Sequence, residues 1–287
     1  MTALGRSQGD GGLGGGMGGG GLGGLTRILP AGFGSRRALL LVERNAYVYR
    51  RTWMVLVSGF FEPLFYLLGI GFGIGGLVGT VAGPNGEPLT YAQFVAPALL
   101  AASSMNGAIY DSTINIFFKL KFARTYDAIL STPLGAGDVA LGEVGWAVVR
   151  GTLYAIGFMV VMVVLGLVSS PLGILAIPAA MVVGFGFAGA GMAATSFMRT
   201  YQDFDLVQLV IMPLFLFSGT FYPLSAYPPV VAAIVQFSPL YRGADLIRGL
   251  TLGLPSATMI LDVAYLVAIG LVGLAIASRR LDRLLLR

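Results

Sequence analysis

Long apolar segments separated by short polar ones make up most of the chain from residue 53 onward. A helix needs about 20 apolar residues to cross the roughly 30 Å hydrocarbon core of a membrane. Six segments approach or exceed that length, at residues 53–78, 92–118, 143–168, 172–197, 206–222 and 256–277. None shows the alternation of apolar and polar residues that is typical of membrane-barrel strands. The pattern therefore predicts an all-α integral membrane protein, with six transmembrane helices in a domain that covers residues 53–280.

Two segments precede the first predicted span, and they differ from each other. Residues 1–34 hold a glycine tract that has little to bury, which predicts a disordered tail. Residues 35–52, SRRALLLVERNAYVYRRT, place apolar residues among arginines. They predict an amphipathic helix that lies in the headgroup region, and packing against the rest of the protein outside the membrane is the alternative. At the other end, residues 281–287 are predicted to form a short tail.

The basic residues predict how the spans are oriented. The chain of 287 residues has 11% charged residues, a net charge of +5 and a mean hydropathy of +0.84. Of its 18 lysines and arginines, 15 lie in segments that six spans would place on one side. Cytoplasmic segments carry such an excess. Both termini and the loop at residues 119–142 are therefore predicted to be cytoplasmic, and the protein is predicted to lie in the plasma or inner membrane.

The residue inventory excludes several kinds of chemistry. The chain has no cysteine and no histidine, which excludes disulfides, thiolate nucleophiles, histidine-ligated metals and Ser-His-Asp triads. Its only lysines, Lys119 and Lys121, do not stand in the GxxxxGK[ST] pattern of a phosphate-binding loop. We therefore expect no cofactor, metal, nucleotide or nucleic acid to bind this chain, so a nucleotide that drives it must be bound by another polypeptide.

Two glycine patterns lie inside predicted spans. Residues 184–189, GFGFAG, match the dinucleotide-binding fingerprint letter for letter, but that motif needs a preceding strand and solvent access. Small residues in a span more often let neighbouring helices approach closely. We expect this role at residues 184–189 and also at the glycines between residues 69 and 76, where ligand binding is the alternative.

Ionisable residues inside the predicted spans have two interpretations. Such residues are costly in hydrocarbon and usually face a cavity or a partner. Glu143 and Arg150 are seven residues apart and hence share a helix face. They and the other buried charges could form structural pairs, for example Arg150 with a carboxylate on a neighbouring helix, or they could serve transport.

The segment at residues 218–255 is too apolar for an ordinary loop and too interrupted by prolines for a spanning helix. Non-helical backbone at membrane depth has to be sheltered by protein or to line a cavity. We predict two short re-entrant or interfacial helices here, with Tyr222, Tyr227 and Tyr241 at the level of the headgroups.

The longest predicted cytoplasmic loop between spans is also structured. Residues 123–130 can form a short helix, which the turn Ser131-Thr132-Pro133-Leu134-Gly135 would end. Asp138 is then placed to cap the next helix. This loop would protrude on the cytoplasmic side.

Three stretches resemble one known family. They are FFEPLFYLLGIGFGIG in the first span, KFARTYDAILSTPLGAGDVALGE after the second, and PLFLFSGTFYPLSAYPPVVAAIVQFSPLYRGADLIRGL after residue 212. In order and spacing they resemble the ABC-2 type export permeases, in particular the branch of nodulation-factor and daunorubicin-resistance exporters. The resemblance covers roughly residues 35–280.

This resemblance implies a six-helix subunit that pairs with a second copy or with a close relative and docks two copies of a cytosolic ABC ATPase, which would bind ATP and magnesium. It also implies that residues 35–52 form a connecting helix, that the cytoplasmic loop couples to the ATPase and that residues 218–255 form an external re-entrant hairpin. The residues predicted for coupling are Lys119, Lys121, Arg124, Tyr126, Asp127, Ile129, Pro133, Asp138 and Glu143. Binding of phospholipid headgroups is the alternative role for the basic ones.

The function that the resemblance implies is ATP-driven export of an amphipathic substrate, such as a drug, lipid or lipo-oligosaccharide, from the cytoplasm or inner leaflet. The path would follow the interface between two copies, lined by the first, second and fifth spans. Candidates for lining or gating it are Glu62, Asp111, Arg150, Phe217, Tyr222, Tyr241, Arg242, Asp245 and Arg248. The alternative is an ion-coupled secondary transporter, although no internal repeat is evident. A membrane-embedded enzyme would lack a convergent catalytic set.

Overall fold

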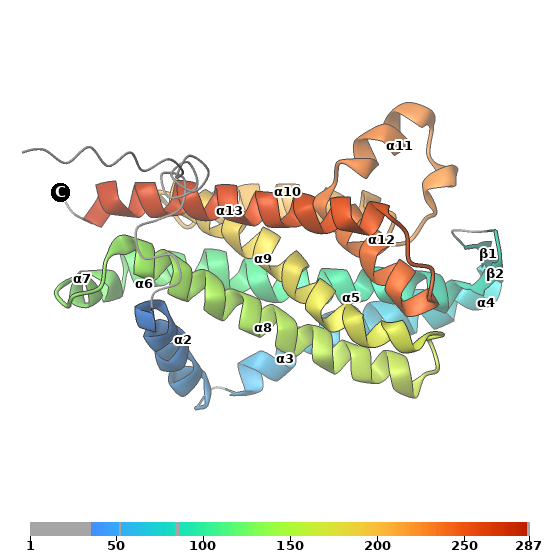
Figure 1. Ribbon diagram of the computed structural model, residues 1–287, viewed down its shortest axis with the longest axis horizontal. Helices are drawn as coiled ribbons and strands as arrows, with labels where there is room; N and C mark the ends of the chain where they lie inside the picture. The colour runs from blue at the N-terminus through green and yellow to red at the C-terminus, as the bar shows by residue number, and fades with distance from the viewer. Residues whose placement is uncertain (1–35, 52, 84–85, 286–287) are drawn as a thin grey trace, which may run out of the picture.

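The computed structural model describes residues 36–51, 53–83 and 86–285. The glycine-rich tail predicted at residues 1–34 therefore lies outside the described residues. Within them the chain is predominantly helical (Figure 1), and the all-α prediction is confirmed. One small hairpin adds to it: strands β1 (Thr80–Ala82) and β2 (Pro88–Thr90) are antiparallel, with Val81 opposite Leu89.

The first part of the chain forms one helix before the predicted spans and two interrupted helices in them. Helix α2 (Arg36–Tyr49) occupies the segment predicted to be amphipathic. The first predicted span consists of α3 (Trp53–Tyr66), the π-helical stretch η1 (Leu67–Ile74) and α4 (Gly75–Val78). The second consists of α5 (Tyr91–Tyr110), the π-helical stretch η2 (Asp111–Asn115) and α6 (Ile116–Lys121). π-Helical turns are rare and occur frequently at functional sites.

The middle of the chain contains a short helix and a long hairpin. Helix α7 (Thr125–Leu130) lies in the predicted cytoplasmic loop. Helix α8 (Ala136–Val164) begins seven residues before the predicted residue 143, because the Asp138 carboxylate accepts the backbone N–H of Gly135 and closes the first turn at 3.1 Å. The 3₁₀ turn η3 (Pro171–Leu175) then leads into α9 (Ala176–Thr195).

The last part of the chain contains the predicted re-entrant region between two longer helices. The two longer helices are α10 (Asp203–Phe217) and α13 (Thr258–Leu285). Between them lie the turn η4 (Leu224–Ala226), α11 (Pro229–Gln236) and α12 (Pro239–Leu252). The pair α11 and α12 is bent by 82°, as expected for a broken or re-entrant segment. Helix α13 continues past the predicted end at residue 277, so residues 281–285 are helical rather than a separate tail.

The structure gives fewer candidate spans than the sequence predicts. By length and composition, four helical segments among the described residues can cross a membrane: Phe61–Val78, Ala136–Val164, Pro171–Thr195 and Thr258–Leu284. The bent pair would make a fifth. Helix α10 has only 15 residues, and α5 is diluted by polar residues such as Ser103 and Ser104. The count of six spans therefore stays a prediction.

The core lies where α5, α8, α9 and α13 pack against one another (Figure 1). Small residues allow close contact, because a Cβ on Gly151 of α8 would lie 2.6 Å from the backbone oxygen of Ser104 on α5. The Ser104 hydroxyl in turn donates to the Ala180 carbonyl of α9 at 2.6 Å. Gly189 of α9 faces the backbone of Gly270 on α13 in the same way. The prediction that the glycines at residues 184–189 let neighbouring helices approach closely is therefore confirmed.

The glycines of the first span pack less closely, since a Cβ on Gly71 or Gly75 would lie 3.8 Å from Ala92 or 3.5 Å from Tyr91 of α5. A Cβ on Gly69 or Gly76 would meet no atom of the described residues within 4 Å, apart from the helix's own backbone. The prediction that these glycines pack helices together is therefore wrong for Gly69 and Gly76 within one subunit. They lie in η1 and α4, where the backbone departs from a regular α-helix.

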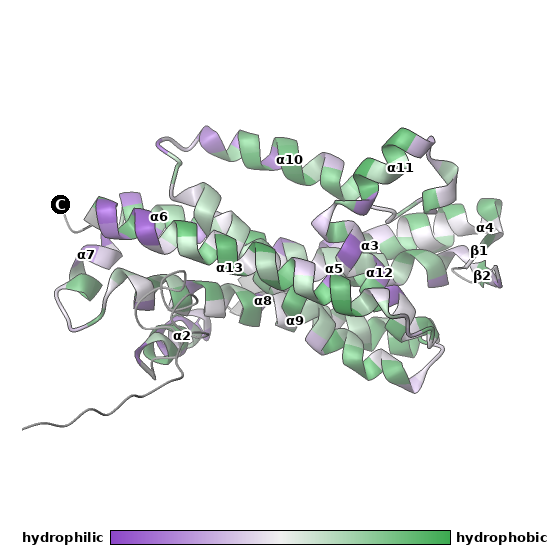
Figure 2. Ribbon diagram, turned by 45° about the horizontal axis from the view of Figure 1, so that its top comes forward, coloured by the Kyte–Doolittle hydropathy of each residue, from purple (hydrophilic) through white to green (hydrophobic). Residues whose placement is uncertain are grey.

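The molecule has two chemically distinct ends. Helices α2, α6 and α7 and the C-terminal end of α13 lie at one end, and β1, β2, α4 and α11 lie at the other (Figure 1). The basic segments predicted to share one side of the membrane thus lie at the same end. Helix α10 stands apart from the core helices (Figure 2), and Phe215 is its only buried residue.

Candidate functional site: a buried polar network and a cavity beside α10

The segment predicted to couple to an ATPase forms α6, α7 and the turn before α8. Of the residues predicted for coupling, Lys121, Arg124, Asp127 and Pro133 are exposed, and Lys119 and Ile129 are half-buried. Arg124 begins α7 in a left-handed conformation, with φ of 46°, a state that is uncommon outside glycine. The segment therefore presents both basic and acidic groups at one end of the molecule.

Three of the predicted coupling residues lie inside the subunit instead of on its surface. Tyr126 is 0% exposed, and Asp138 and Glu143 are buried. Burial raises the pKa of the Tyr126 hydroxyl well above its ordinary value, and the nearby Glu143 carboxylate adds to this effect. In this conformation these side chains position the segment, and the apolar surface expected from Tyr126 is not available to a partner.

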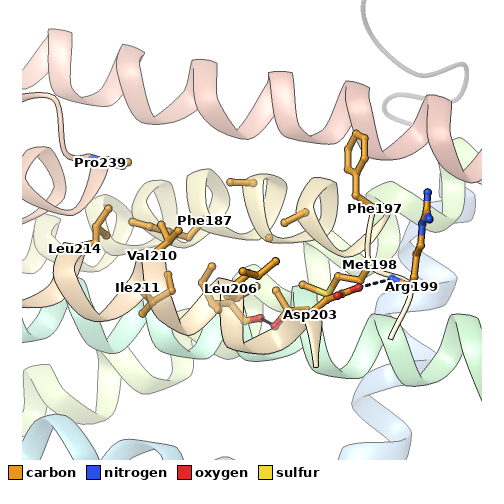
Figure 3. Close-up of a pocket in the computed structure, with 16 residues that line it drawn as sticks. Phe187, Phe197, Met198, Arg199, Asp203, Leu206, Val210, Ile211, Leu214 and Pro239 are labelled. Carbon is orange, nitrogen blue, oxygen red and sulfur yellow. Dashed lines mark hydrogen bonds between the residues drawn. The ribbon is translucent and has the colours of Figure 1, made fainter. Parts of the chain in front are cut away.

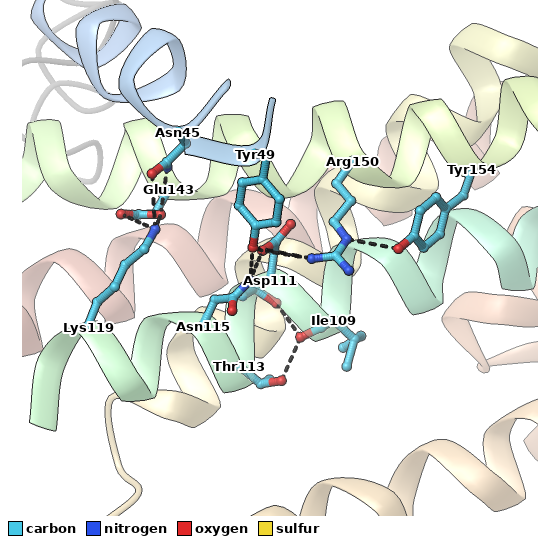
Figure 4. Close-up of polar contacts among 11 residues, drawn as sticks. Asn45, Tyr49, Ile109, Asp111, Thr113, Asn115, Lys119, Glu143, Arg150 and Tyr154 are labelled. Atoms are coloured by element: carbon cyan, nitrogen blue, oxygen red, sulfur yellow. Dashed lines mark hydrogen bonds and ion pairs between the residues drawn. The ribbon is translucent and has the colours of Figure 1, made fainter. Parts of the chain in front are cut away.

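Glu143 is held between two elements that are distant in sequence. The Lys119 ammonium from α6 contacts its carboxylate at 2.7 Å, and the Asn45 amide from α2 donates to it at 3.1 Å (Figure 4). The Lys119 ammonium also donates to the side-chain oxygen Oδ1 of Asn45 at 3.2 Å. Because the Glu143 side chain is only 2% exposed, these contacts replace its lost hydration and fasten α2 and α6 to α8.

A second cluster surrounds Arg150, which lies about two helical turns after Glu143 in α8. Its guanidinium lies 3.3 Å from the Asp111 carboxylate of η2 and donates to the Tyr154 hydroxyl at 3.0 Å (Figure 4). The Tyr49 hydroxyl of α2 donates to Asp111 at 3.0 Å, and Asn115 also donates to Asp111. Arg150 lies over the Tyr110 ring as well, 4.5 Å from its centroid. The π-helical turn η2 thus places Asp111 and Asn115 where α2, α5 and α8 meet.

We call these two clusters together the polar network; its residues are Asn45, Tyr49, Asp111, Asn115, Lys119, Glu143, Arg150 and Tyr154. The sequence left two interpretations of the buried charges open, structural pairing and transport. The structure pairs Arg150 with Asp111, a carboxylate from another part of the helical bundle. Sequence reasoning missed Asn45, Tyr49 and Asn115. The four-residue spacing of Asn45 and Tyr49 on one face of an amphipathic helix was the available signal.

Two further contacts connect the predicted coupling segment to the rest of the fold. Arg37 of α2 donates to the Pro133 carbonyl at 2.9 Å. Phe117 of α6 packs edge-on against Phe204 of α10, with ring centroids 5.1 Å apart. The segment is therefore tied to α2, to α8 and to the beginning of α10.

Helix α10 begins with a tight turn. The Asp203 carboxylate accepts the backbone N–H groups of Arg199 and Thr200 at 2.6 and 3.1 Å, and these bonds lower the pKa of the carboxyl group. Asp203 therefore holds the turn that precedes α10, whereas the N-cap residue of the helix, Gln202, makes no side-chain capping bond.

The opposite end of the molecule holds its own buried arginine. Arg248 of α12 is 5% exposed and donates to the backbone oxygens of Phe94 at 3.2 Å and Gly219 at 3.0 Å. Its guanidinium also lies 4.2 Å from the centroid of the Phe94 ring. Gly219 has a positive φ of 66° directly after α10, so Arg248 fixes the backbone where α10 ends.

The other residues at this end that were predicted to line or gate the transport path do not form one cluster. Arg242 pairs with Asp262 of α13 at 3.0 Å, and the Tyr241 ring packs beside Gly219. Asp245 is half-buried, and Phe217 and Tyr222 are exposed. These residues do not converge with Glu62, Asp111 or Arg150, which belong to other parts of the fold.

Glu62 lies in a cavity between α3, α5 and α10. This cavity of about 230 Å³ is also lined by Asn106, Tyr110, Gln208 and Phe215. These three helices correspond to the first, second and fifth predicted spans. The cavity brings polar groups of all three together, at Glu62, Asn106 and Gln208.

The helical architecture with its membrane-spanning segments is that of a multi-pass membrane protein, and comparison with known proteins shows which class it belongs to. The model of the ABC-2 type transporter family matches residues 36–252 of this chain, which therefore belongs to that family. It is similar to nodulation protein J of Rhizobium leguminosarum bv. viciae, with 33% identity over 261 residues, 89% of this chain and 98% of the relative. It is also similar to nodulation protein J of Rhizobium meliloti (strain 1021), with 29% identity over 85% and 92% of the two chains.

A more distant relative is the inner membrane transport permease YadH of Escherichia coli (strain K12). It shares 27% identity over 69% of this chain and 75% of its own. The chain is thus a multi-pass membrane subunit of a transport system, with the architecture of an ABC-2 permease.

Proposed function

We propose that this protein is the membrane subunit of an ATP-driven exporter, which moves an amphipathic substrate out of the cytoplasm or the inner leaflet. Two copies of a cytosolic ABC ATPase would bind ATP and magnesium and dock at the end that carries α2, α6 and α7. Both termini would be cytoplasmic, in the plasma or inner membrane. The clustering of basic segments at this end supports the orientation.

The observation that carries the proposal is the connection of α6 and α7 to the transmembrane core. The surface of this segment carries Lys121, Arg124 and Asp127, which a partner can reach. Exposed Phe118 and Phe122, 43% and 66% exposed, offer the apolar anchor expected of a docking surface. The polar network joins the same segment to α2, α5 and α8 through buried charges.

Rigid-body movement would then transmit the work of the ATPase. A buried ion pair resists separation, because an uncompensated charge in a low-dielectric interior is costly. A displacement of α7 would therefore carry α2, η2 and α8 with it. Helix α10, which has one buried residue, would be free to move relative to this body and to change the cavity at Glu62.

A second copy of the permease would complete the path. The face formed by α3 and α10 exposes large apolar residues beside the cavity, among them Phe61, Phe65, Leu209 and Met212. In a dimer these side chains would be covered, and the cavities of two copies would face each other. At the external end, the segment fixed by Arg248 would gate the exit.

The test is co-purification and transport with a charge reversal on the exposed surface. Arg124→Glu together with Asp127→Lys should abolish both ATPase binding and ATP-dependent export from proteoliposomes, while leaving the amount of folded permease unchanged. The matched control is Arg279→Glu at the far end of α13. If the wild-type permease purifies without an ATPase and the double variant still exports, the coupling proposal is wrong.

One observation favours the second candidate, an ion-coupled transporter. Glu62 is a carboxylate in a predicted span with no ion-pair partner in the described part of the chain, as a proton-coupling group would be. Export that persists after ATP depletion and stops with an uncoupler would favour this candidate and overturn the first.

A further inference from the structure

Helix α2 packs its hydrogen-bonding residues inward and leaves large apolar residues outside. Its buried side lies close to α8, since a Cβ on Gly142 would be 2.6 Å from the Cβ of Leu41. Asn45 and Tyr49 on this side point into the polar network (Figure 4). On the remaining surface of the helix, four large apolar side chains are between 52% and 68% exposed: Leu39, Leu40, Tyr47 and Val48. Contiguous apolar patches that stay exposed mark surfaces that bind a partner or a membrane.

Arginines lie among these apolar residues. Arg44 is exposed within the helix, and Arg50 and Arg51 are exposed directly after it. The guanidinium groups of Arg50 and Arg51 make no hydrogen bond or ion pair with another described residue. Glu43 is the only acidic residue of α2, so this surface carries a positive charge. We call it the outward face of α2; its residues are Leu39, Leu40, Arg44, Tyr47, Arg50 and Arg51.

Helix α10 has an exposed apolar surface of a different kind. A cavity of about 690 Å³ beside it is lined by residues such as Leu206 and Val210, and the charged residues of that cavity, Arg199 and Asp203, lie together at one end (Figure 3). On the outward face of α2, by contrast, arginines alternate with apolar residues. Such a mixture fits the headgroup region of a membrane, where apolar side chains reach the acyl chains and arginines reach the phosphates.

The position of α2 in the chain favours lipid over a protein partner. Helix α3, which begins the first predicted span, starts at Trp53, two residues after Arg51. Arg50 and Arg51 therefore lie where the chain enters the membrane, at the level of the headgroups. Tyr47, about one turn earlier, is of a residue type that is enriched at this level. Basic side chains in such a position attract anionic phospholipids.

We propose that the outward face of α2 binds the headgroups of anionic phospholipids and thereby holds Asn45 and Tyr49 in the polar network. Arg44 and Arg50 flank these two residues in the chain, so lipid that restrains the arginines also restrains the side chains that donate to Glu143 and to the Asp111 carboxylate. The inference rests on the proposed function for one consequence: a membrane without anionic lipid would weaken the transmission of work from α7 to the core.

Crosslinking to lipid tests the binding. Because the chain has no cysteine, Ala46→Cys on the exposed side of α2 gives a unique attachment point for a benzophenone maleimide. The full chain is illuminated in nanodiscs of equal amounts of phosphatidylglycerol and phosphatidylcholine, and mass spectrometry identifies the attached lipid. Phosphatidylglycerol should exceed phosphatidylcholine about tenfold among the adducts, equivalent to about 1.4 kcal/mol. Equal amounts of the two lipids, or no lipid adduct at all, would overturn the proposal.

Removal of the charges shows whether the arginines are responsible. The triple variant Arg44→Gln, Arg50→Gln and Arg51→Gln should bring the lipid ratio at residue 46 to that of the bulk. The matched control, Arg283→Gln on the exposed end of α13, should keep the enrichment of phosphatidylglycerol. Enrichment that survives in the triple variant would exclude the arginines as the binding groups. Crosslinks from residue 46 to a protein in place of lipid, in cells, would assign the face to a protein partner and overturn the proposal.

The opening of α2 tests the link to the polar network. Leu41→Cys places a thiol on the buried side, against Gly142, where a water-soluble maleimide reaches it only when α2 lifts from α8. Labelling should be about tenfold slower in phosphatidylglycerol than in phosphatidylcholine nanodiscs, a coupling of ordinary size, and this difference should vanish in the triple variant. Equal rates in the two lipids would overturn the link. Because no ATPase is present in the nanodiscs, these results overturn this inference alone, and failure to recruit an ATPase overturns the proposed function alone.

Discussion

The charged groups between α2 and α8 form ion pairs, whereas the polar side chains that line the cavity between α3, α5 and α10 do not. Glu143 and Asp111 are each held by a cation and by neutral side chains from other helices. Glu62, Asn106 and Gln208 face a cavity without partners in the described residues. Buried ion pairs resist separation of the helices that carry them, whereas Glu62 and Gln208 are exposed and need no protein partner. Under the proposed function, the first region would transmit force and the second would line the substrate path.

The largest effect is expected from breaking the pair at the centre of the polar network. Arg150→Ala leaves the Asp111 carboxylate buried without its cation, which should lower the free energy of unfolding by about 3–5 kcal/mol. Thermal or denaturant unfolding in detergent measures this loss. The double variant Asp111→Asn with Arg150→Met removes both charges and should restore most of the stability. Equal loss in both variants would show that packing, not charge pairing, matters at this site.

A smaller effect is expected from adding a methyl group between core helices. Gly151→Ala places a Cβ 2.6 Å from the Ser104 backbone oxygen, so α5 and α8 must separate. Overpacking of this kind costs about 1–3 kcal/mol. Gly69→Ala is the matched control in the loosely packed first span, where the Cβ meets nothing within 4 Å. It should leave stability unchanged or raise it slightly, and a comparable loss in both would contradict the contrast between the two regions.

The smallest loss of stability is expected at the edge of the network. Lys119→Ala leaves Glu143 with the Asn45 amide, and the Lys119 side chain is 19% exposed, so water can replace part of the lost interaction. We expect a cost of about 1 kcal/mol, together with a large loss of transport per ATP hydrolysed. The charge swap Lys119→Glu with Glu143→Lys should recover coupling. Unchanged transport efficiency in Lys119→Ala would remove this pair from the coupling route.

Much of the fold could be predicted from the sequence because membrane burial imposes strong local constraints. Apolar length located the helices, and the prolines of residues 218–255 identified α11 and α12 as a broken region. The early start of α8 was missed because the capping contact of Asp138 with Gly135 extends the helix through a polar segment. The hairpin of β1 and β2 was not predicted, because strands of three residues are too short to show an alternation of apolar and polar residues.

The site was less predictable, because it depends on contacts between distant residues. Glu143 and Asp111 were identified by their cost in a membrane. The side chains that donate to them, Asn45, Tyr49 and Asn115, are ordinary polar residues whose role emerges from packing. Tyr126 was expected to contact a partner, and the tertiary fold buries it instead. Amphipathic pattern alone does not reveal which face of a short helix such as α7 the rest of the chain will cover.

The central claim is that α7 receives work from an ATPase, and site-specific crosslinking tests it most directly. Because the chain has no cysteine, Asp127→Cys provides a unique attachment point for a photoactivatable maleimide. Glu87→Cys, next to β2 at the opposite end, provides the control. Illumination in cells should link residue 127, and not residue 87, to a protein that binds ATP. Crosslinks from residue 127 to lipid alone, or labelling of residue 127 by a membrane-impermeant maleimide added outside the cell, would contradict the account.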